Sequence, residues 1–194
     1  MKIIIMGKSA AGKNHLARKM KELGLNQIVT DTTRAMRPGE RDGVDYNFVS
    51  EKDFLRNISE SKYMEYKSYE TINGTVYYGS RSTAFENGDF IILTPSGVKD
   101  IAPILESRKI KYQTILLDAD KDLRLQRSLK RGDKVEEVLR RYDKDERDFR
   151  NVEAAICFNT TEWTDREVTA AAEMLRDLCR KSVSYTHLRA HETT

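Results

Sequence analysis

Short apolar runs alternate with segments of helical periodicity along most of this chain. Four runs predict strands that are buried on both faces of a sheet: Ile3–Met6, Phe90–Thr94, Thr114–Leu117 and Ile156–Phe158. Apolar residues recur at helical spacing from Leu16 to Leu23, and Gly24 is placed to end that helix. The alternation predicts an α/β fold with a parallel sheet and helices on both of its faces.

The segment between the first helix and the Phe90 run has a different pattern. It is rich in Tyr and Thr, it contains short alternating β segments, and Ser50–Asp53 is placed to open one short helix. We interpret residues 31–87 as an inserted α+β substrate lobe in a core made of residues 1–30 and 88–181. Thr164–Glu167 forms a capping box that predicts a final helix through Leu178.

A glycine-rich loop, Gly7–Asn14, lies between the first strand and the first helix. In this setting backbone N–H groups and the positive end of the helix surround a phosphate, while a lysine reaches the outer phosphates of a nucleoside triphosphate. A chance glycine-rich turn is the competing interpretation. The predicted fold is therefore a P-loop NTPase three-layer sandwich, and the predicted ATP-binding residues are Gly7, Ser9, Ala10, Ala11, Gly12, Lys13 and Asn14. Asn14 stands where the motif has Ser or Thr, and its amide oxygen is a candidate ligand for Mg²⁺.

The most specific pattern in the chain follows the first helix. Residues 30–50 read TDTTRAMRPGERDGVDYNFVS, and residues 77–80 read YYGS. With the glycine-rich loop, these segments resemble guanylate kinase, over residues 1 to about 180, and look more like its short divergent relatives in bacteria and phages. The resemblance implies phosphoryl transfer from ATP to GMP or dGMP with Mg²⁺ as cofactor. A kinase of another nucleoside monophosphate is the nearest alternative, and a noncatalytic guanylate kinase-like binding module is another, against which the presence of Gly12 and Lys13 argues.

Two arginines in this pattern can clamp a phosphate. Arg34 and Arg37 carry planar forks suited to a monophosphate dianion, and the turn after Arg37 lets Glu40 return and orient Arg37. The family resemblance assigns Arg34, Arg37, Tyr46 and Tyr78 to the phosphate of GMP. A solvated loop of surface arginines is the alternative.

Glu65 falls where the resemblance places a carboxylate that reads guanine. A carboxylate can accept from both N1–H and the 2-amino group of guanine, whereas adenine has no donor at N1. Thr30 and Ser80 match hydroxyls that the family turns toward the base. A solvent-facing strand residue is the alternative for Glu65, because Glu70 lies nearby and leaves the register open.

A third group of arginines lies in residues 121–141. Arg124, Arg127 and Arg131 belong to a helix that begins near Lys121, and Arg127 and Arg131 share one face of it. The resemblance implies a helical lid over about 127–145, in which Arg127, Arg131 and Arg141 stabilise the transferring phosphoryl group together with Lys13. Arg140 lies one residue away from the position that matches the lid arginine of the family. The alternative interpretation of residues 121–145 is a pair of surface helices joined by salt bridges.

The resemblance is incomplete at one position. Many guanylate kinases end the strand equivalent to Phe90–Thr94 with aspartates, whereas this chain has Thr94, Pro95 and Ser96. We therefore expect Mg²⁺ to be held mainly by nucleotide phosphates and water.

Composition narrows the class of protein. The 194 residues suit one domain, and 34 basic against 31 acidic side chains give a net charge of +3, which does not indicate nucleic acid as a partner. The two cysteines, Cys157 and Cys179, do not have the spacing of a metal or redox motif. There is also no signal-peptide or membrane-spanning pattern, so we expect a cytoplasmic protein without a membrane partner. Nothing in the sequence indicates the oligomeric state. We interpret residues 182–194 as a non-native or disordered tail resembling translated sequencing adapter, despite its two histidines.

Overall fold

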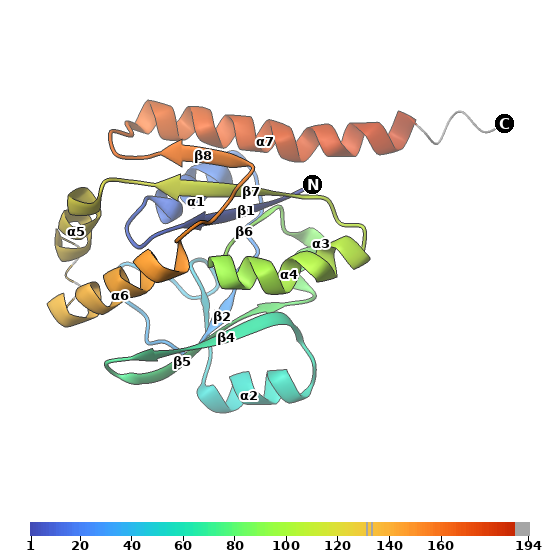
Figure 1. Ribbon diagram of the computed structural model, residues 1–194. Helices are drawn as coiled ribbons and strands as arrows, with labels where there is room; N and C mark the ends of the chain where they lie inside the picture. The colour runs from blue at the N-terminus through green and yellow to red at the C-terminus, as the bar shows by residue number, and fades with distance from the viewer. Residues whose placement is uncertain (131, 133, 189–194) are drawn as a thin grey trace.

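The computed structural model contains two four-stranded sheets (Figure 1). It describes residues 1–130, 132 and 134–188, with side chains as far as Arg180. The first sheet is parallel, with the order β6-β1-β7-β8, and consists of β1 (Lys2–Gly7), β6 (Phe90–Ile92), β7 (Tyr112–Asp118) and β8 (Ile156–Asn159). These are the four predicted strands. β6 ends two residues before the predicted Thr94, because the Thr94 hydroxyl instead caps the next helix and accepts from the Gly97 amide at 3.2 Å.

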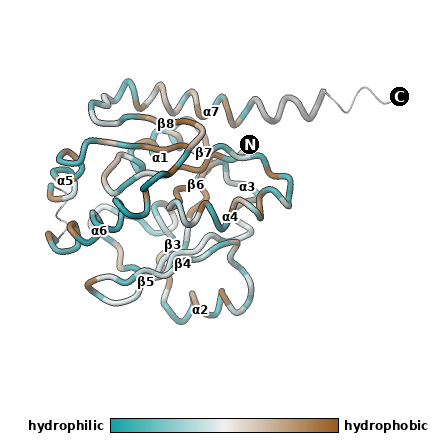
Figure 2. Tube along the Cα trace, viewed as in Figure 1, coloured by the Kyte–Doolittle hydropathy of each residue, from teal (hydrophilic) through white to brown (hydrophobic). Residues whose placement is uncertain are grey.

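Helices cover both faces of this sheet, as the burial of consecutive residues in β1 requires. Ile3 and Ile5 pack with helices α1 (Lys13–Glu22) and α7 (Asp165–Leu188), whereas Ile4 packs with α4 (Pro95–Ser107) on the opposite face. Figure 2 shows hydrophobic residues gathered along the parallel strands, while α6 (Val135–Asp148) is largely hydrophilic. The three-layer arrangement thus follows from strands that are apolar on both sides.

The second sheet lies between α1 and β6 in the chain and forms the lower part of Figure 1. Its order is β3-β2-β5-β4, with β2 (Asp31–Thr32), β3 (Asn47–Phe48), β4 (Tyr63–Thr71) and β5 (Gly74–Arg81). Helix α2 (Glu51–Ser59) packs beside it, and α3 (Ala84–Asn87) leads back to β6. All of these strands fall within the predicted insert.

The predicted capping residues at the ends of three helices are present in the structure. Ser50 accepts from the Asp53 amide at 3.0 Å, and in the capping box before α7 the Thr164 amide donates to Glu167 at 2.6 Å. Gly24 follows α1 with a φ of +81°, a conformation in which a Cβ is strained. The predicted end of the last helix at Leu178 differs from the structure, in which α7 continues to Leu188 and buried Cys179 still belongs to the core. Residues 189–194 of the predicted tail lie outside the described residues.

A buried carboxylate joins the strands of the second sheet. Asp31 in β2 is 0% exposed, and its oxygens accept from Asn47 in β3 at 2.9 Å, from the Tyr63 hydroxyl in β4 at 2.8 Å and from the Arg81 guanidinium in β5 at 2.7 Å. A buried charge is tolerated only when it is paired and hydrogen-bonded, as Asp31 is.

Replacing Asp31 should destabilise the protein without touching the cavity. Asp31→Ala leaves three donors without their acceptor, and we expect a loss of about 3 kcal/mol in the free energy of unfolding, measured by urea denaturation. Glu70→Ala is the matched control on an exposed position of β4, where the expected loss is under about 0.5 kcal/mol. Equal losses would show that the Asp31 contacts contribute nothing specific.

Candidate active site

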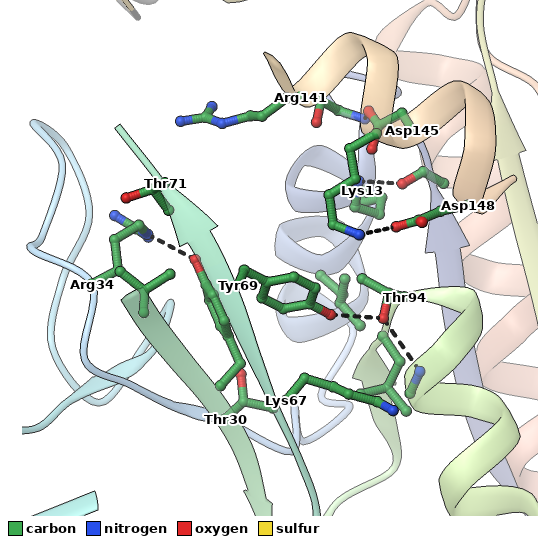
Figure 3. A pocket seen from close by; sticks show the side chains of 18 of the residues that line it. Lys13, Thr30, Arg34, Lys67, Tyr69, Thr71, Thr94, Arg141, Asp145 and Asp148 are labelled. Atoms are coloured by element: carbon green, nitrogen blue, oxygen red, sulfur yellow. Dashed lines mark hydrogen bonds and ion pairs between the residues drawn. The ribbon is translucent and has the colours of Figure 1, made fainter. Parts of the chain in front are cut away.

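A cavity of about 250 Å³ lies where the glycine-rich loop, the second sheet and α6 meet. Ten of the predicted site residues line it: Gly7, Ser9, Lys13, Thr30, Arg34, Arg37, Tyr46, Glu65, Tyr78 and Arg141. Figure 3 labels Lys13, Thr30, Arg34 and Arg141 among them. A second depression adjoins it at the loop and is lined by Ala10, Ala11, Gly12, Asn14, Glu40 and Arg127. Ser80 is 0% exposed and lies behind Glu65. Arg131 lies outside the described residues.

The glycine-rich loop has the backbone shape that an anion site needs. Gly12 has a φ of +91°, and a Cβ on Gly7 would come within 2.6 Å of the Leu117 carbonyl oxygen. The Thr160 hydroxyl donates to the Ala11 carbonyl at 3.0 Å and fixes the loop against β8. The Lys13 ammonium folds back across the loop and donates to the Gly7 carbonyl at 2.6 Å.

Carboxylates from α6 contact this loop. The Ser9 amide donates to Asp145 at 2.5 Å, and Lys8 pairs with Glu146 at 3.0 Å. Asp145 thus places an anion against a loop whose amides are suited to phosphate oxygens. Glu146 also accepts from Arg124 at 3.3 Å, which connects α6 to helix α5 (Lys121–Lys130).

Arg34 is held by contacts on every side. Its guanidinium donates to both oxygens of Glu40 at 2.9 and 3.0 Å and to the Tyr78 hydroxyl at 3.2 Å, and it lies 5.3 Å from the centre of the Tyr46 ring. Glu40 also contacts Arg37, as expected, but its closer side-chain contact is with Arg34. The Arg37 backbone amide donates to Glu40 at 2.8 Å, and the Arg37 guanidinium forms an ion pair with the same carboxylate at 4.0 Å.

Two phenols complete this corner of the cavity. Tyr46 and Tyr78 meet edge to face with ring centres 5.8 Å apart. Burial raises the pKa of Tyr46 to about 12, so its hydroxyl keeps its proton at neutral pH and is able to donate to an anion.

Glu65 is buried against the cavity. It is 8% exposed, its carboxylate accepts from the Ser80 hydroxyl at 2.5 Å, and burial raises its pKa above the usual carboxyl value. In the β4–β5 register Glu65 pairs with Ser80, whereas Glu70 pairs with Thr75 and is exposed. The alternative of a solvent-facing Glu65 is therefore excluded.

The described arginines of α5 and α6 have different surroundings. Arg127 donates to the carbonyls of Ala10 at 3.3 Å and Thr160 at 3.2 Å, beside the loop. Arg140 and Arg141 both line the cavity and share Glu137 at 2.8 Å each, and the hydrogen bonds from Arg140 and then Arg141 lower the pKa of Glu137 to about 2. Arg140 and Arg141 therefore form ion pairs within α6 and also face the cavity.

Arg124 is structural. It is 2% exposed, donates to the Ala119 carbonyl at 3.1 Å and lies 4.7 Å from the centre of the Tyr142 ring, so it joins α5 to α6.

Sequence reasoning missed several cavity residues. Lys67, Tyr69 and Thr71 follow Glu65 at every second position of β4, and Lys144 and Asp145 follow Arg141 by one helical turn. The periods of a strand and a helix are the signals that could have found them, once Glu65 and Arg141 are taken as site residues.

The chain offers few ligands of its own for a metal. Within residues 1–130, 132 and 134–188, no three His, Cys, Asp or Glu side chains are grouped so that they could hold a metal ion. The Thr94 hydroxyl, in the place of the family's aspartates, hydrogen-bonds instead to Tyr69 at 3.2 Å. In the same part of the chain no helix is long and apolar enough to cross a membrane.

Comparison with known proteins identifies the family. A family model described as guanylate kinase matches residues 1–173. The chain belongs to the guanylate kinase family. It is 34% identical over 145 residues to a guanylate kinase of Desulfotalea psychrophila, covering 71% of this chain and 68% of that protein. It is 32% identical over 147 residues to a guanylate kinase of Baumannia cicadellinicola, covering 72% and 71%.

Other matches are shorter, and one solved structure supports the fold. The chain spans 24% of the length of guanylate kinase 2, chloroplastic/mitochondrial, of rice, 43% of a guanylate kinase of Fusobacterium nucleatum and 50% of one of Bdellovibrio bacteriovorus. The crystal structure of guanylate kinase from Anaplasma phagocytophilum superposes with a TM-score of 0.58 and 21% identity, covering 93% of this chain and 86% of that one. The predicted P-loop fold is thereby confirmed.

The Asp145 contact predicts a change in ATP affinity. Because the Asp145 carboxylate binds the Ser9 amide, a phosphate group has to displace it. Asp145→Asn weakens that competing contact by about 1 kcal/mol, so we expect the Kd for ATP to fall roughly fivefold in calorimetry. Asp143→Asn removes the same charge from an exposed position of α6 and should leave the Kd unchanged. Equal effects in both variants would mean that only the net charge matters.

Proposed function

We propose that this protein transfers the γ phosphoryl group of ATP to GMP or dGMP, giving ADP and the guanosine diphosphate. The observation that carries this proposal is one cavity that is lined by Lys13 of the phosphate loop, by Arg34 and Arg37, and by Glu65. The loop suits the triphosphate, the arginines suit a monophosphate, and the carboxylate suits the donor edge of guanine. Membership of the guanylate kinase family supports the same activity.

Positioning and charge account for the chemistry in this proposal. An oxygen of the monophosphate forms a bond to the γ phosphorus of ATP, while the bond from that phosphorus to the bridging oxygen breaks and ADP leaves with the electron pair. Arg34 and Arg37 hold the attacking group, and Lys13, Arg127, Arg131 and Arg141 stabilise the charge that spreads over the transferring group. No side chain has to form a covalent intermediate.

Contacts between α6 and the insert support a closed reaction site. The Lys144 ammonium lies 4.9 Å from the centre of the Tyr69 ring, so the helix that carries Arg140 and Arg141 already touches β4. Closure of this kind excludes water, which would otherwise accept the phosphoryl group.

Mg²⁺ fits this arrangement as an ion carried by ATP. Asn14 is exposed at the loop and offers one amide oxygen, and Mg²⁺ commonly keeps its waters and takes only one or two protein ligands beside nucleotide phosphates. When bound, the ion would neutralise phosphate charge.

We also propose cytoplasmic activity, which the two free cysteines support.

A coupled assay of ADP release tests the proposed function. Turnover should be highest with GMP or dGMP in a panel that includes AMP, CMP, UMP and dTMP. Preference for another monophosphate would contradict the substrate, and calorimetric binding of GMP without any turnover would identify a noncatalytic module.

Glu65 should determine the choice of base. Glu65→Gln replaces one acceptor of a buried bidentate contact by a donor, so kcat/KM should fall by about tenfold or more for GMP and by much less for AMP. The raised pKa gives a second expectation. In the parent protein kcat/KM for GMP should fall as the pH drops through the pKa of Glu65, which lies above the usual carboxyl value, because the protonated carboxyl group no longer accepts twice.

The same variant separates binding from folding. Ionised Glu65 is disfavoured by burial, so Glu65→Gln should not lower the free energy of unfolding at pH 7, and the acid limb of the pH profile should disappear. An equal loss for GMP and AMP would exclude a base-reading role.

Asn14 should raise the requirement for magnesium. An amide side chain is longer than the Ser or Thr of the motif, and Mg²⁺ demands near-octahedral oxygens at about 2.0–2.1 Å. We expect Asn14→Ser to reach half-maximal ATP affinity at a lower magnesium concentration, measured by calorimetry as well as by turnover. An unchanged or higher requirement would show that the loop is adapted to Asn.

A further inference from the structure

Lys67 is a second charged residue on the wall that carries Glu65. It lies two positions farther along β4, and both residues line the cavity. Two residues of a strand span about 6.6 Å and point to the same face. Figure 3 shows the Lys67 side chain running from β4 toward α4, below Tyr69.

The Lys67 ammonium is fixed by α4. It contacts the Asp100 carboxylate at 2.5 Å, and this hydrogen bond raises the pKa of Lys67, so the side chain stays charged at neutral pH. Burial is the main cause of the raised pKa of Glu65; the charge of Asp100 raises this pKa further, and the charge of Lys67 lowers it slightly. Because an ammonium group has three donors and Asp100 uses one, Lys67 keeps donors for a ligand.

We propose that Lys67 reads the acceptor edge of the purine, donating to O6 of guanine while Glu65 accepts from N1–H and the 2-amino group. This inference rests on the proposed function. A carboxylate and an ammonium side by side match a base edge on which donors and an acceptor are side by side. Adenine presents the reverse pattern, an acceptor at N1 and an amino group at position 6, and the amino group offers Lys67 no acceptor.

A purely structural role is the competing explanation. Together with the hydrogen bond between the Tyr69 and Thr94 hydroxyls at 3.2 Å, the Lys67–Asp100 pair connects β4 to α4. A tether of this kind would support the binding of every nucleotide equally, so discrimination at position 6 of the base separates the two roles.

The test compares GMP with 6-thio-GMP, which keeps every donor of guanine and replaces O6 by sulfur, a weaker acceptor. We expect the parent protein to prefer GMP, and Lys67→Met to lower kcat/KM for GMP by about tenfold or more with a much smaller loss for 6-thio-GMP. Asp100→Asn breaks the ion pair and leaves the cation, so the preference for GMP should persist. Lys62→Met removes an exposed lysine immediately before β4 and should leave kcat/KM unchanged for both GMP and 6-thio-GMP.

Two outcomes would overturn the inference. Equal losses for both nucleotides in Lys67→Met, or loss of the preference for GMP in Asp100→Asn as complete as in Lys67→Met, would assign the lysine to a tether. Calorimetric Kd values for both nucleotides give the same comparison without turnover. Absence of GMP turnover in the parent protein would contradict the proposed function alone, since the Kd comparison would still report on Lys67.

Discussion

Carboxylates hold the basic side chains of the cavity in fixed positions. Arg34 is bound by Glu40, Arg140 and Arg141 share Glu137, and Lys67 is bound by Asp100. In the proposed reaction, a site for two nucleotides has to collect cations that repel one another and whose long side chains lose conformational freedom when they are ordered. Pairing each cation with a carboxylate at the edge of the cavity lowers both costs, so the site is organised before any ligand enters it.

The same principle explains how α6 meets the phosphate loop. Asp145 and Glu146 bind Ser9 and Lys8, so the loop contacts carboxylates of the chain itself. A triphosphate carries more charge than these groups and offers more oxygens to the backbone amides. ATP binding in the proposed reaction is therefore an exchange of anions at the loop, which couples the position of α6 to the nucleotide.

The sequence predicted what short-range patterns control. Apolar runs predicted the parallel strands, and glycine spacing predicted the phosphate loop, because both depend on residues that are close in the chain. The closer contact of Glu40 with Arg34 was missed because it depends on how a turn aims one side chain. The surroundings of Glu65 needed the register of a hairpin, in which a β-bulge between Tyr63 and Glu65 leaves both Met64 and Glu65 buried. Strict alternation would have placed one of these two neighbours in solvent.

The bulge also connects Glu65 to the core of the insert. Tyr63, immediately before it, donates to buried Asp31, which also binds Asn47 and Arg81 on neighbouring strands. β4 is therefore fixed at one end by Asp31 and farther along by the contacts of Lys67 and Tyr69 with α4 and Thr94. Glu65 lies between these two anchors, so its carboxylate is held in place by contacts that do not involve a ligand. A rigid acceptor discriminates between bases more strongly than a mobile one, because a mispaired base cannot be accommodated by a shift of the strand.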